Sequence, residues 1–273
     1  MPTLAEVVAA IERRYDPRLA ADWDSVGLFC GDPSAEVSRI HVAVDPVEAI
    51  VDEAIGTAAQ LLLTHHPLFL GGTESVAATT AKGRLVQRLI SHGIGLYVAH
   101  TSADVARPGV SDALATVLGL QDIRPVPPDV EHGLGRIGEL ANPVSLREFA
   151  IAVAGALPAT RSGVRAAGDL EREVRVVAVC GGAGLDLAPA VAAAGADVLV
   201  TSDHKHHSSS ETLADLGIAL IDASHWATEQ PWVAAAAELL AADLHAAGTT
   251  VEATASTTVT DPWTLHAHSP EEL

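Results

Sequence analysis

Cationic and aromatic side chains are scarce in this sequence, and both scarcities argue against a nucleic-acid-binding protein. The 273 residues include 16 Lys and Arg against 35 Asp and Glu, which gives a formal net charge of −19. Binding to nucleic acids depends largely on cationic contacts to phosphates, and single-stranded ligands also need aromatic rings for base stacking. Only 3% of the residues are aromatic. We therefore expect no nucleic acid among the partners.

Long apolar runs and paired cysteines are also missing. No stretch approaches the roughly 18 consecutive apolar residues that would span a bilayer. The two cysteines, Cys30 and Cys180, lie far apart and form no CxxC motif, so two reduced thiols are expected. The first 14 residues have the pattern of a capped amphipathic helix and not of a signal peptide. These features predict a cytoplasmic protein that does not contact membranes.

Strand-like and helix-like segments alternate along the chain, which is typical of an α/β protein with largely parallel sheets. Apolar and β-branched runs predict strands at 40–44, 61–64, 94–99, 174–180, 198–201 and 218–222. Helices are expected at 46–57, 82–92, 111–118, 145–157, 187–194, 209–216 and 231–247, besides the helix at the N-terminus.

Three blocks of the first half recur in the same order in the second half. IHVAVD resembles RVVAVC, LLLTHH resembles VLVTSDH, and GIGLYVAHTSAD resembles GIALIDASHWATE. The third pair matches in polar as well as apolar residues, which favours an internal duplication. We therefore predict two related α/β domains, the first formed by 1–125 plus 231–273 and the second by 126–230. The proline-rich residues 125–128 are the best candidate for a linker.

Histidines and carboxylates follow several of the predicted strands. Four polar clusters lie there: His65 with His66, residues 100–104, residues 203–207 and residues 225–229. In parallel α/β sheets, ligands bind beyond the carboxyl ends of the strands, so these clusters are expected to form one site. Imidazole together with carboxylate suits Zn, Fe, Mn or Ni rather than Ca or Mg alone.

The spacing within the clusters leaves some alternatives open. His100 with Asp104 and His225 with Glu229 have the i, i+4 spacing of one helix face, although both pairs could lie in loops. Adjacent side chains of an extended chain point to opposite sides, so His65 and His66 share a site only if the backbone turns or if each binds its own ion. Five or six such ligands exceed one tetrahedral zinc and leave room for a second ion.

Two further segments have more than one interpretation. The cluster of residues 203–207 could support the metal ligands, bind substrate, or simply open a helix. The glycine-rich residues 181–184 follow a strand and precede a helix. They could cradle a phosphate at the helix N-terminus or form a tight turn.

Taken together, the motifs resemble the YbgI-like family, whose members are catalogued as GTP cyclohydrolase type 2 homologues or NGG-interacting-factor-like proteins. The motifs are LLLTHHPLF, AHTSADVARPGVSDALATVLGL, GLGRIGEL, VAVCGGAG, GADVLVTSDHKHH and IDASHWATEQP. The resemblance implies a homohexameric ring with a dinuclear centre of two divalent ions (Zn, Fe or Mn) in each chain, between the two domains. It maps the metal ligands onto His65, His66, Asp104, His225 and Glu229, with Glu229 as the bridge.

The resemblance also implies that His100 lies close to the metals and Asp203 at the rim of the site. Both are the expected catalytic residues, because either could move a proton. The first functional hypothesis is a metal-dependent hydrolase that acts on a nucleotide-like or other small-molecule substrate. The alternative is a non-enzymatic metal-binding scaffold or regulatory ring.

Overall fold

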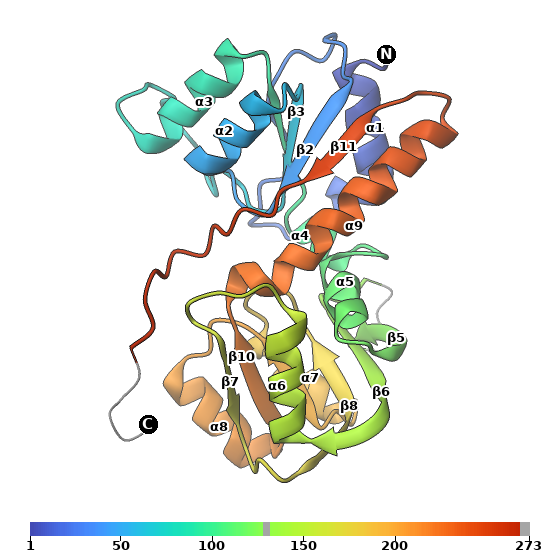
Figure 1. Cartoon of the computed structure of the whole chain (residues 1–273), viewed down its shortest axis with the longest axis vertical. Helices are drawn as coiled ribbons and strands as arrows, with labels where there is room; N and C mark the ends of the chain where they lie inside the picture. Colours follow the sequence, from blue (N-terminus) through green and yellow to red (C-terminus); the bar gives the residue numbers. More distant parts are fainter. Residues whose placement is uncertain (128–131, 268–273) are drawn as a thin grey trace. The chain divides into compact units, whose positions relative to one another are not determined.

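The computed structural model describes residues 1–127 and 132–267, which belong to two compact units (Figure 1). Unit 1 comprises Met1–Gly109 and Trp232–Thr260, and unit 2 comprises Val110–Pro231 and the chain from Asp261 on. Of the proline-rich residues, 125 and 126 lie in a strand, and 128 lies outside the described residues. The domain limits inferred from the sequence stay a prediction.

Unit 1 is built on a five-stranded sheet with the order β1-β4-β3-β2-β11. Strands β4, β3, β2 and β11 are parallel, and β1 is antiparallel to β4. The strands are β1 (Gly27–Cys30), β2 (Arg39–Ala43), β3 (Leu61–Thr64), β4 (Gly95–Val98) and β11 (Glu252–Ala255), and the helices are α1 (Leu4–Arg14), η1 (Pro17–Leu19), α2 (Glu48–Gly56), α3 (Ala81–Ser91) and α4 (Thr101–Val105).

Helices cover both faces of the sheet of unit 1. Helices α2 and α3 pack on one face, where Ile50, Leu89 and Leu62 belong to one buried apolar cluster. Helix α1 lies on the other side of the sheet (Figure 1), and its Tyr15 accepts a hydrogen bond from Trp232 of α9. With both faces covered, the inner strands are fully buried, so polar side chains gather at the strand ends.

Unit 2 is built on a six-stranded sheet with the order β5-β6-β8-β9-β10-β7. The inner strands β8, β9 and β10 are parallel, and β5, β6 and β7 are antiparallel to their neighbours. The strands are β5 (Gln121–Val126), β6 (Gly135–Ser145), β7 (Val164–Ala167), β8 (Glu173–Val179), β9 (Val198–Thr201) and β10 (Ala219–Ala223), and the helices are α5 (Val110–Val117), α6 (Leu146–Ala156), η2 (Leu185–Leu187), α7 (Ala188–Ala193) and α8 (His206–Leu216).

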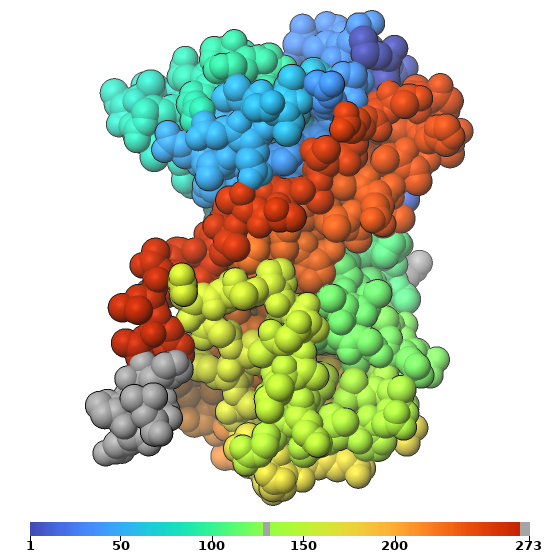
Figure 2. All heavy atoms as spheres, in the orientation of Figure 1, coloured from blue at the N-terminus to red at the C-terminus, as the bar shows by residue number. Residues whose placement is uncertain are grey.

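In unit 2 helix α6 lies on one face of the sheet and α7 and α8 on the other (Figure 1). Val191 of α7 and Leu213 of α8 pack with Leu199 and Leu220 of the sheet in a second apolar cluster. Helix α9 (His225–Ala246) begins in unit 2 and ends in unit 1. The chain after β11 has no regular secondary structure and lies on the surface, where Trp263 and Leu265 are exposed (Figure 2).

The structure confirms the α/β class with two sheets, and each of the six predicted strands is present with ends within one residue. The prediction missed β11 and the antiparallel strands β1, β5, β6 and β7. Helix α9 corrects a predicted start, because it begins at His225 and includes Pro231 in its interior instead of starting there. Within the described residues, no helix combines the length and the apolar character needed to cross a membrane.

Candidate metal centre

His65 and His66 end strand β3 in a backbone turn that brings both imidazoles together. Their consecutive N–H groups both donate to strand β2 and its continuation, to the carbonyls of Ala43 and Val44. In a regular strand successive N–H groups point in opposite directions, so this pattern marks a bend after Thr64. The two ring centroids lie 5.0 Å apart. The alternative that the two side chains point to opposite sides is therefore excluded.

Both imidazoles are held through Nδ1. The Nδ1 of His65 lies 3.2 Å from the carbonyl oxygen of Ala99, and that of His66 lies 2.7 Å from Oδ1 of Asp45. A carbonyl or carboxylate oxygen only accepts, so Nδ1 carries the proton in each ring. A histidine that donates from one ring nitrogen to an oxygen acceptor is the arrangement found in metal-binding histidines.

His100 follows strand β4 and is held in the same way by Asp24. Its Nδ1 lies 2.8 Å from Oδ1 of Asp24, whose other oxygen accepts from the Thr101 amide at 3.0 Å and the Thr101 hydroxyl at 2.5 Å. Burial alone would raise the pKa of Asp24, but these hydrogen bonds hold it below its ordinary value. Burial also lowers the pKa of His100, helped by the nearby His65, so a neutral imidazole is favoured.

The side chains of unit 1 meet closely enough to bind one ion. His65, His66 and His100 each offer a ring nitrogen, and these atoms lie within 4.8 Å of one another. Asp104, four residues after His100 on α4, has its Oδ1 at 3.7 Å from Nε2 of His65. Unit 1 thus brings together four of the residues predicted from the sequence, and the pair His100–Asp104 lies at the start of a helix and not in a loop.

Unit 2 brings together the other three predicted residues. His225 is the first residue of α9 and Glu229 lies one turn later, with Nε2 and Oε1 2.9 Å apart. The Nδ1 of His225 lies 2.6 Å from Oδ2 of Asp203. The separation of 2.9 Å is that of an ion pair, and about 3 Å is also the separation of two atoms bound at ~2.1 Å to one ion, so these residues fit a divalent cation.

Asp203 lies in a strained turn that aims its carboxylate at His225. Its φ of 57° is in the left-handed region, which Asp tolerates better than most residues. This contact selects one of the alternatives for residues 203–207: Asp203 orients a candidate metal ligand. His204, the next residue, points into a separate cavity described below.

The glycine-rich segment after β8 is a turn that packs against the carboxylate of Glu229. Gly182 has a φ of 65°, and a Cβ placed there would lie 2.6 Å from Oε1 of Glu229 and 3.0 Å from Nε2 of His225. Its amide donates to the Thr228 hydroxyl at 2.9 Å. The segment forms a turn, and the phosphate-binding alternative stays a prediction. Glycine is required at position 182 because any side chain would occupy the space beside His225 and Glu229.

The residues that orient the histidines were missed in unit 1. Asp45 ends the strand run IHVAVD, so the same strand-end argument that selected His65 would have found it. Asp24 lies in an irregular segment between η1 and β1, where no periodicity signals a function. Its role follows only from the fold, which places it against His100 although 76 residues separate them.

These features define an α/β protein with histidine and carboxylate clusters at the ends of parallel strands. Residues 2–262 match the model of the family described as Duf34/NIF3 (NGG1p interacting factor 3). The chain belongs to this family, as the sequence motifs had predicted.

Individual relatives agree along nearly the whole chain. A Streptomyces coelicolor protein named GTP cyclohydrolase 1 type 2 homolog is 50% identical over 98% of this chain and 96% of its own length. Among solved structures, a Staphylococcus aureus hypothetical protein is 27% identical with a TM-score of 0.89 over 97% of this chain and all of its own. The protein ybgI, of unknown function, is 25% identical with a TM-score of 0.78 over 92% of this chain and 96% of its own.

Proposed function

We propose that the two clusters together hold two divalent metal ions, Zn, Fe or Mn, through His65, His66, Asp104, His225 and Glu229. One observation carries this proposal: each histidine of both clusters is oriented through Nδ1 by an oxygen acceptor, and the histidines stand in groups whose possible ligand atoms lie within 4.8 Å of one another. Glu229 is buried, and a buried carboxylate beside an imidazole lone pair is stable only with a cation or proton between them.

The reaction that best suits this centre is metal-dependent hydrolysis of a nucleotide-like or other small molecule. Bound divalent ions supply Lewis acidity and lower the pKa of water. The free Nε2 of His100, backed by Asp24, is placed to take and return a proton. Asp203 keeps His225 in one tautomer and serves as a second proton carrier at the edge of the cluster. The names of several relatives point to the same class of reaction.

A non-enzymatic metal-binding scaffold or regulatory ring is the competing function. The number of imidazoles favours hydrolysis, because His100 adds a fourth nitrogen beside the five proposed ligands and gives the site a group that can transfer protons.

Metal content and activity should be measured on the same preparations. Reconstituted protein should contain two ions per chain by elemental analysis, and should hydrolyse a member of a panel of phosphoesters, nucleotides and cyclic amides. His66→Ala should lose metal and activity together. At most one ion per chain would overturn the dinuclear centre, and two ions without turnover on any substrate would favour the scaffold.

We also propose that six copies of the chain form a ring, as the family resemblance implies. Light scattering at micromolar concentration should give about six times the 28.1 kDa mass of one chain. A stable species of the monomer mass would contradict the ring while leaving the metal centre untouched.

A further inference from the structure

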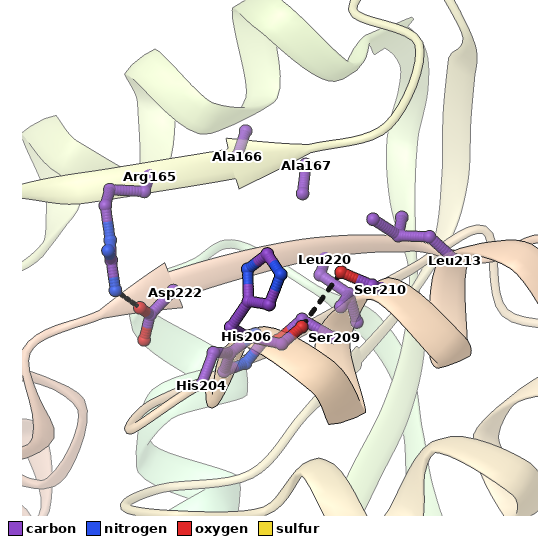
Figure 3. A pocket seen from close by; sticks show the side chains of 10 residues that line it. All are labelled: Arg165, Ala166, Ala167, His204, His206, Ser209, Ser210, Leu213, Leu220 and Asp222. Carbon is purple, nitrogen blue, oxygen red and sulfur yellow. Dashed lines mark hydrogen bonds and ion pairs between the residues drawn. The ribbon is translucent and has the colours of Figure 1, made fainter.

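Unit 2 contains a cavity of about 410 Å³ that the proposed metal ligands do not line. It lies between strand β7, strand β10 and helix α8 (Figure 3). Small side chains create the space, because Ala167 stands opposite Leu220 in the β7–β10 pair and α8 contributes Ser209 and Ser210. The volume is within the range of small-molecule sites.

One end of the cavity presents a hydrogen-bond donor beside an acceptor. Arg165 of β7 is paired in register with Asp222 of β10, and its guanidinium reaches across to the carboxylate (Figure 3). The side chain of Asp222 is only 12% exposed, whereas that of Arg165 is 70% exposed. The carboxylate therefore belongs to the wall and the guanidinium to the mouth, where its remaining N–H groups can donate to a ligand.

The two serines add acceptors along the helix side. The hydroxyl of Ser209 donates to the carbonyl of Lys205 at 2.8 Å, and that of Ser210 donates to the carbonyl of His206 at 2.9 Å. Each hydroxyl proton is thus already used, and each oxygen keeps lone pairs. Together with Asp222, the serine oxygens give the cavity wall several acceptors, which suit a ligand that carries N–H groups.

His204 leaves a polar atom without a partner in the cavity wall. Its Nε2 is buried and forms no hydrogen bond with any residue that the structure describes. Burial lowers the pKa of His204, so the ring is neutral and can match a neutral ligand. The His206 imidazole rises from the first turn of α8 toward β7, and its flat face lies beside the same space (Figure 3).

We propose that this cavity binds a planar nitrogen heterocycle with a lactam edge, in which a ring C=O stands beside a ring N–H. The carbonyl accepts from Arg165 and the N–H donates to Asp222. The apolar side chains and the His206 ring pack against the faces of the heterocycle. Oxo-type bases such as hypoxanthine and uracil carry this edge, whereas adenine and cytosine present an amino group beside an unprotonated ring nitrogen.

The cavity adjoins the cluster of unit 2 through consecutive residues. Asp203 contacts His225, and His204 lines the cavity. If the cavity is the substrate pocket of the hydrolase, that role rests on the proposed function. Binding of the heterocycle to the cavity does not depend on it. The test therefore measures binding to the full-length protein after its metals have been removed with a chelator, so that it succeeds or fails independently of hydrolysis.

Calorimetric titration should compare inosine with adenosine and uridine with cytidine, since each pair shares its sugar and ring size. We expect the oxo-type nucleoside to bind at least about tenfold more tightly in each pair, because the other presents its donor and acceptor in the reverse order and matches Asp222 and Arg165 only when turned over, with its sugar on the opposite side. Ser209→Leu should fill the cavity and weaken inosine binding by about tenfold or more. Ser208→Leu, the same change on the neighbouring exposed residue, should leave it unchanged.

Arg165→Gln gives a second, conservative test at a largely exposed side chain. It should reduce the preference for inosine over adenosine, whereas Arg147→Gln, which breaks the exposed ion pair with Glu171, should not. Equal binding of the members of each pair, no binding up to millimolar concentration, or unchanged binding in a folded Ser209→Leu protein would each overturn the proposal. Circular dichroism establishes that the variants are folded.

Discussion

The two units place their chemistry at matching points but share it unequally. His100 follows β4 and His225 follows β10, and each has a carboxylate four residues later on a helix. At the end of β3 unit 1 adds His65 and His66, whereas the matching residues after β9 are Ser202 and Asp203. The matching positions are consistent with the predicted internal duplication. One unit is rich in imidazoles, and the other contributes a buried carboxylate.

The supports of the two clusters also differ. In unit 1, Asp45, which orients His66, lies in a repeated block, whereas Asp24, which orients His100, lies outside all three blocks. In unit 2, Asp203 lies in a repeated block, and Gly182 leaves room for Glu229. The comparison can be tested by changing one unit at a time and following metal content.

The largest difference is expected between the two carboxylates at matching positions. Glu229→Gln should lose both metals or retain one, whereas Asp104→Asn should mainly weaken one. Glutamate has one more methylene and can reach between two ions, whose repulsion at ~3.5 Å is large even at an effective dielectric of about 20. Parallel titrations of both variants with Zn²⁺ or Mn²⁺ measure this difference.

The reverse result is equally informative. If Asp104→Asn empties the site and Glu229→Gln keeps both ions, Glu229 is no bridge and the two units have the opposite roles. Equal losses of metal in the two variants would mean that neither carboxylate acts as a bridge between the ions.

A methyl group at Gly182 should weaken metal binding nearly as much as Glu229→Gln does. The same change at Gly163, a matched glycine, separates this steric effect from backbone strain. Gly182→Ala puts a Cβ 2.6 Å from Oε1 of Glu229, whereas a Cβ at Gly163 meets nothing within 4 Å. Both residues have φ near 65°, so both changes should destabilise unit 2 by roughly 1–2 kcal/mol. Only Gly182→Ala should lower metal affinity, by about 100-fold.

Thermal melts and metal titrations of the two glycine variants test this together. Equal melting temperatures with unequal metal affinity support a steric effect at the site. Loss of metal by Gly163→Ala as well would assign the effect to the backbone of unit 2.

The carboxylates that orient the histidines should have smaller effects. Asp24→Asn should lower metal affinity by about tenfold, because the amide nitrogen of Asn cannot accept the hydrogen bonds of Thr101 that fix the side chain. Asp203→Asn should cost less, since the side chain of Asp203 is 58% exposed and that of Asp24 is fully buried. Asp32→Asn, on an exposed loop carboxylate bonded to Ser34, is the control. A larger loss of metal affinity in Asp203→Asn than in Asp24→Asn would contradict this order.

The sequence predicts those elements whose signal lies in their own residues, and it misses those that form only through contacts with distant parts of the chain. Buried inner strands such as β3 and β9 were found because apolar, β-branched runs mark them. The edge strand β7, Val-Arg-Ala-Ala, carries no such pattern and forms because β10 offers a pairing edge. Strand β11 likewise depends on β2, more than 200 residues earlier in the chain.

The same division holds for the candidate site. His65, His66, His225 and Glu229 follow recognisable strands and could be selected one by one. Asp24 could not be selected in this way, because its role is visible only in its contact with His100, which lies 76 residues later in the sequence. Helix α9 began earlier than expected because Pro231 was interpreted as a first-turn proline, whereas packing tolerates it inside the helix.

The smallest expected effect concerns the stability of unit 1 in acid. Glu53 of α2 accepts hydrogen bonds from the hydroxyls of Ser256 and Thr258 and lies 3.0 Å from Nε2 of His41. Burial would raise the pKa of Glu53, but these partners lower it below its ordinary value. A carboxyl whose pKa is lower in the folded than in the unfolded chain stabilises the fold above the unfolded pKa, and this contribution disappears as pH falls through the folded pKa.

Glu53→Gln should therefore reduce the stability of unit 1 by about 1 kcal/mol at pH 7, a figure kept small because Glu53 is partly exposed. The difference from the unchanged protein should shrink as the pH falls through the lowered pKa of folded Glu53, below which the carboxyl is protonated in both states. Amide hydrogen exchange resolves the two units, and it should increase in β2 and β11 but not in β9 or β10. Glu252→Gln, which removes only an exposed pair with Arg39, should leave all four strands unchanged. Faster exchange in unit 2, or a difference that does not shrink as the solution is made more acidic, would mean that Glu53 acts through something other than its charge in unit 1.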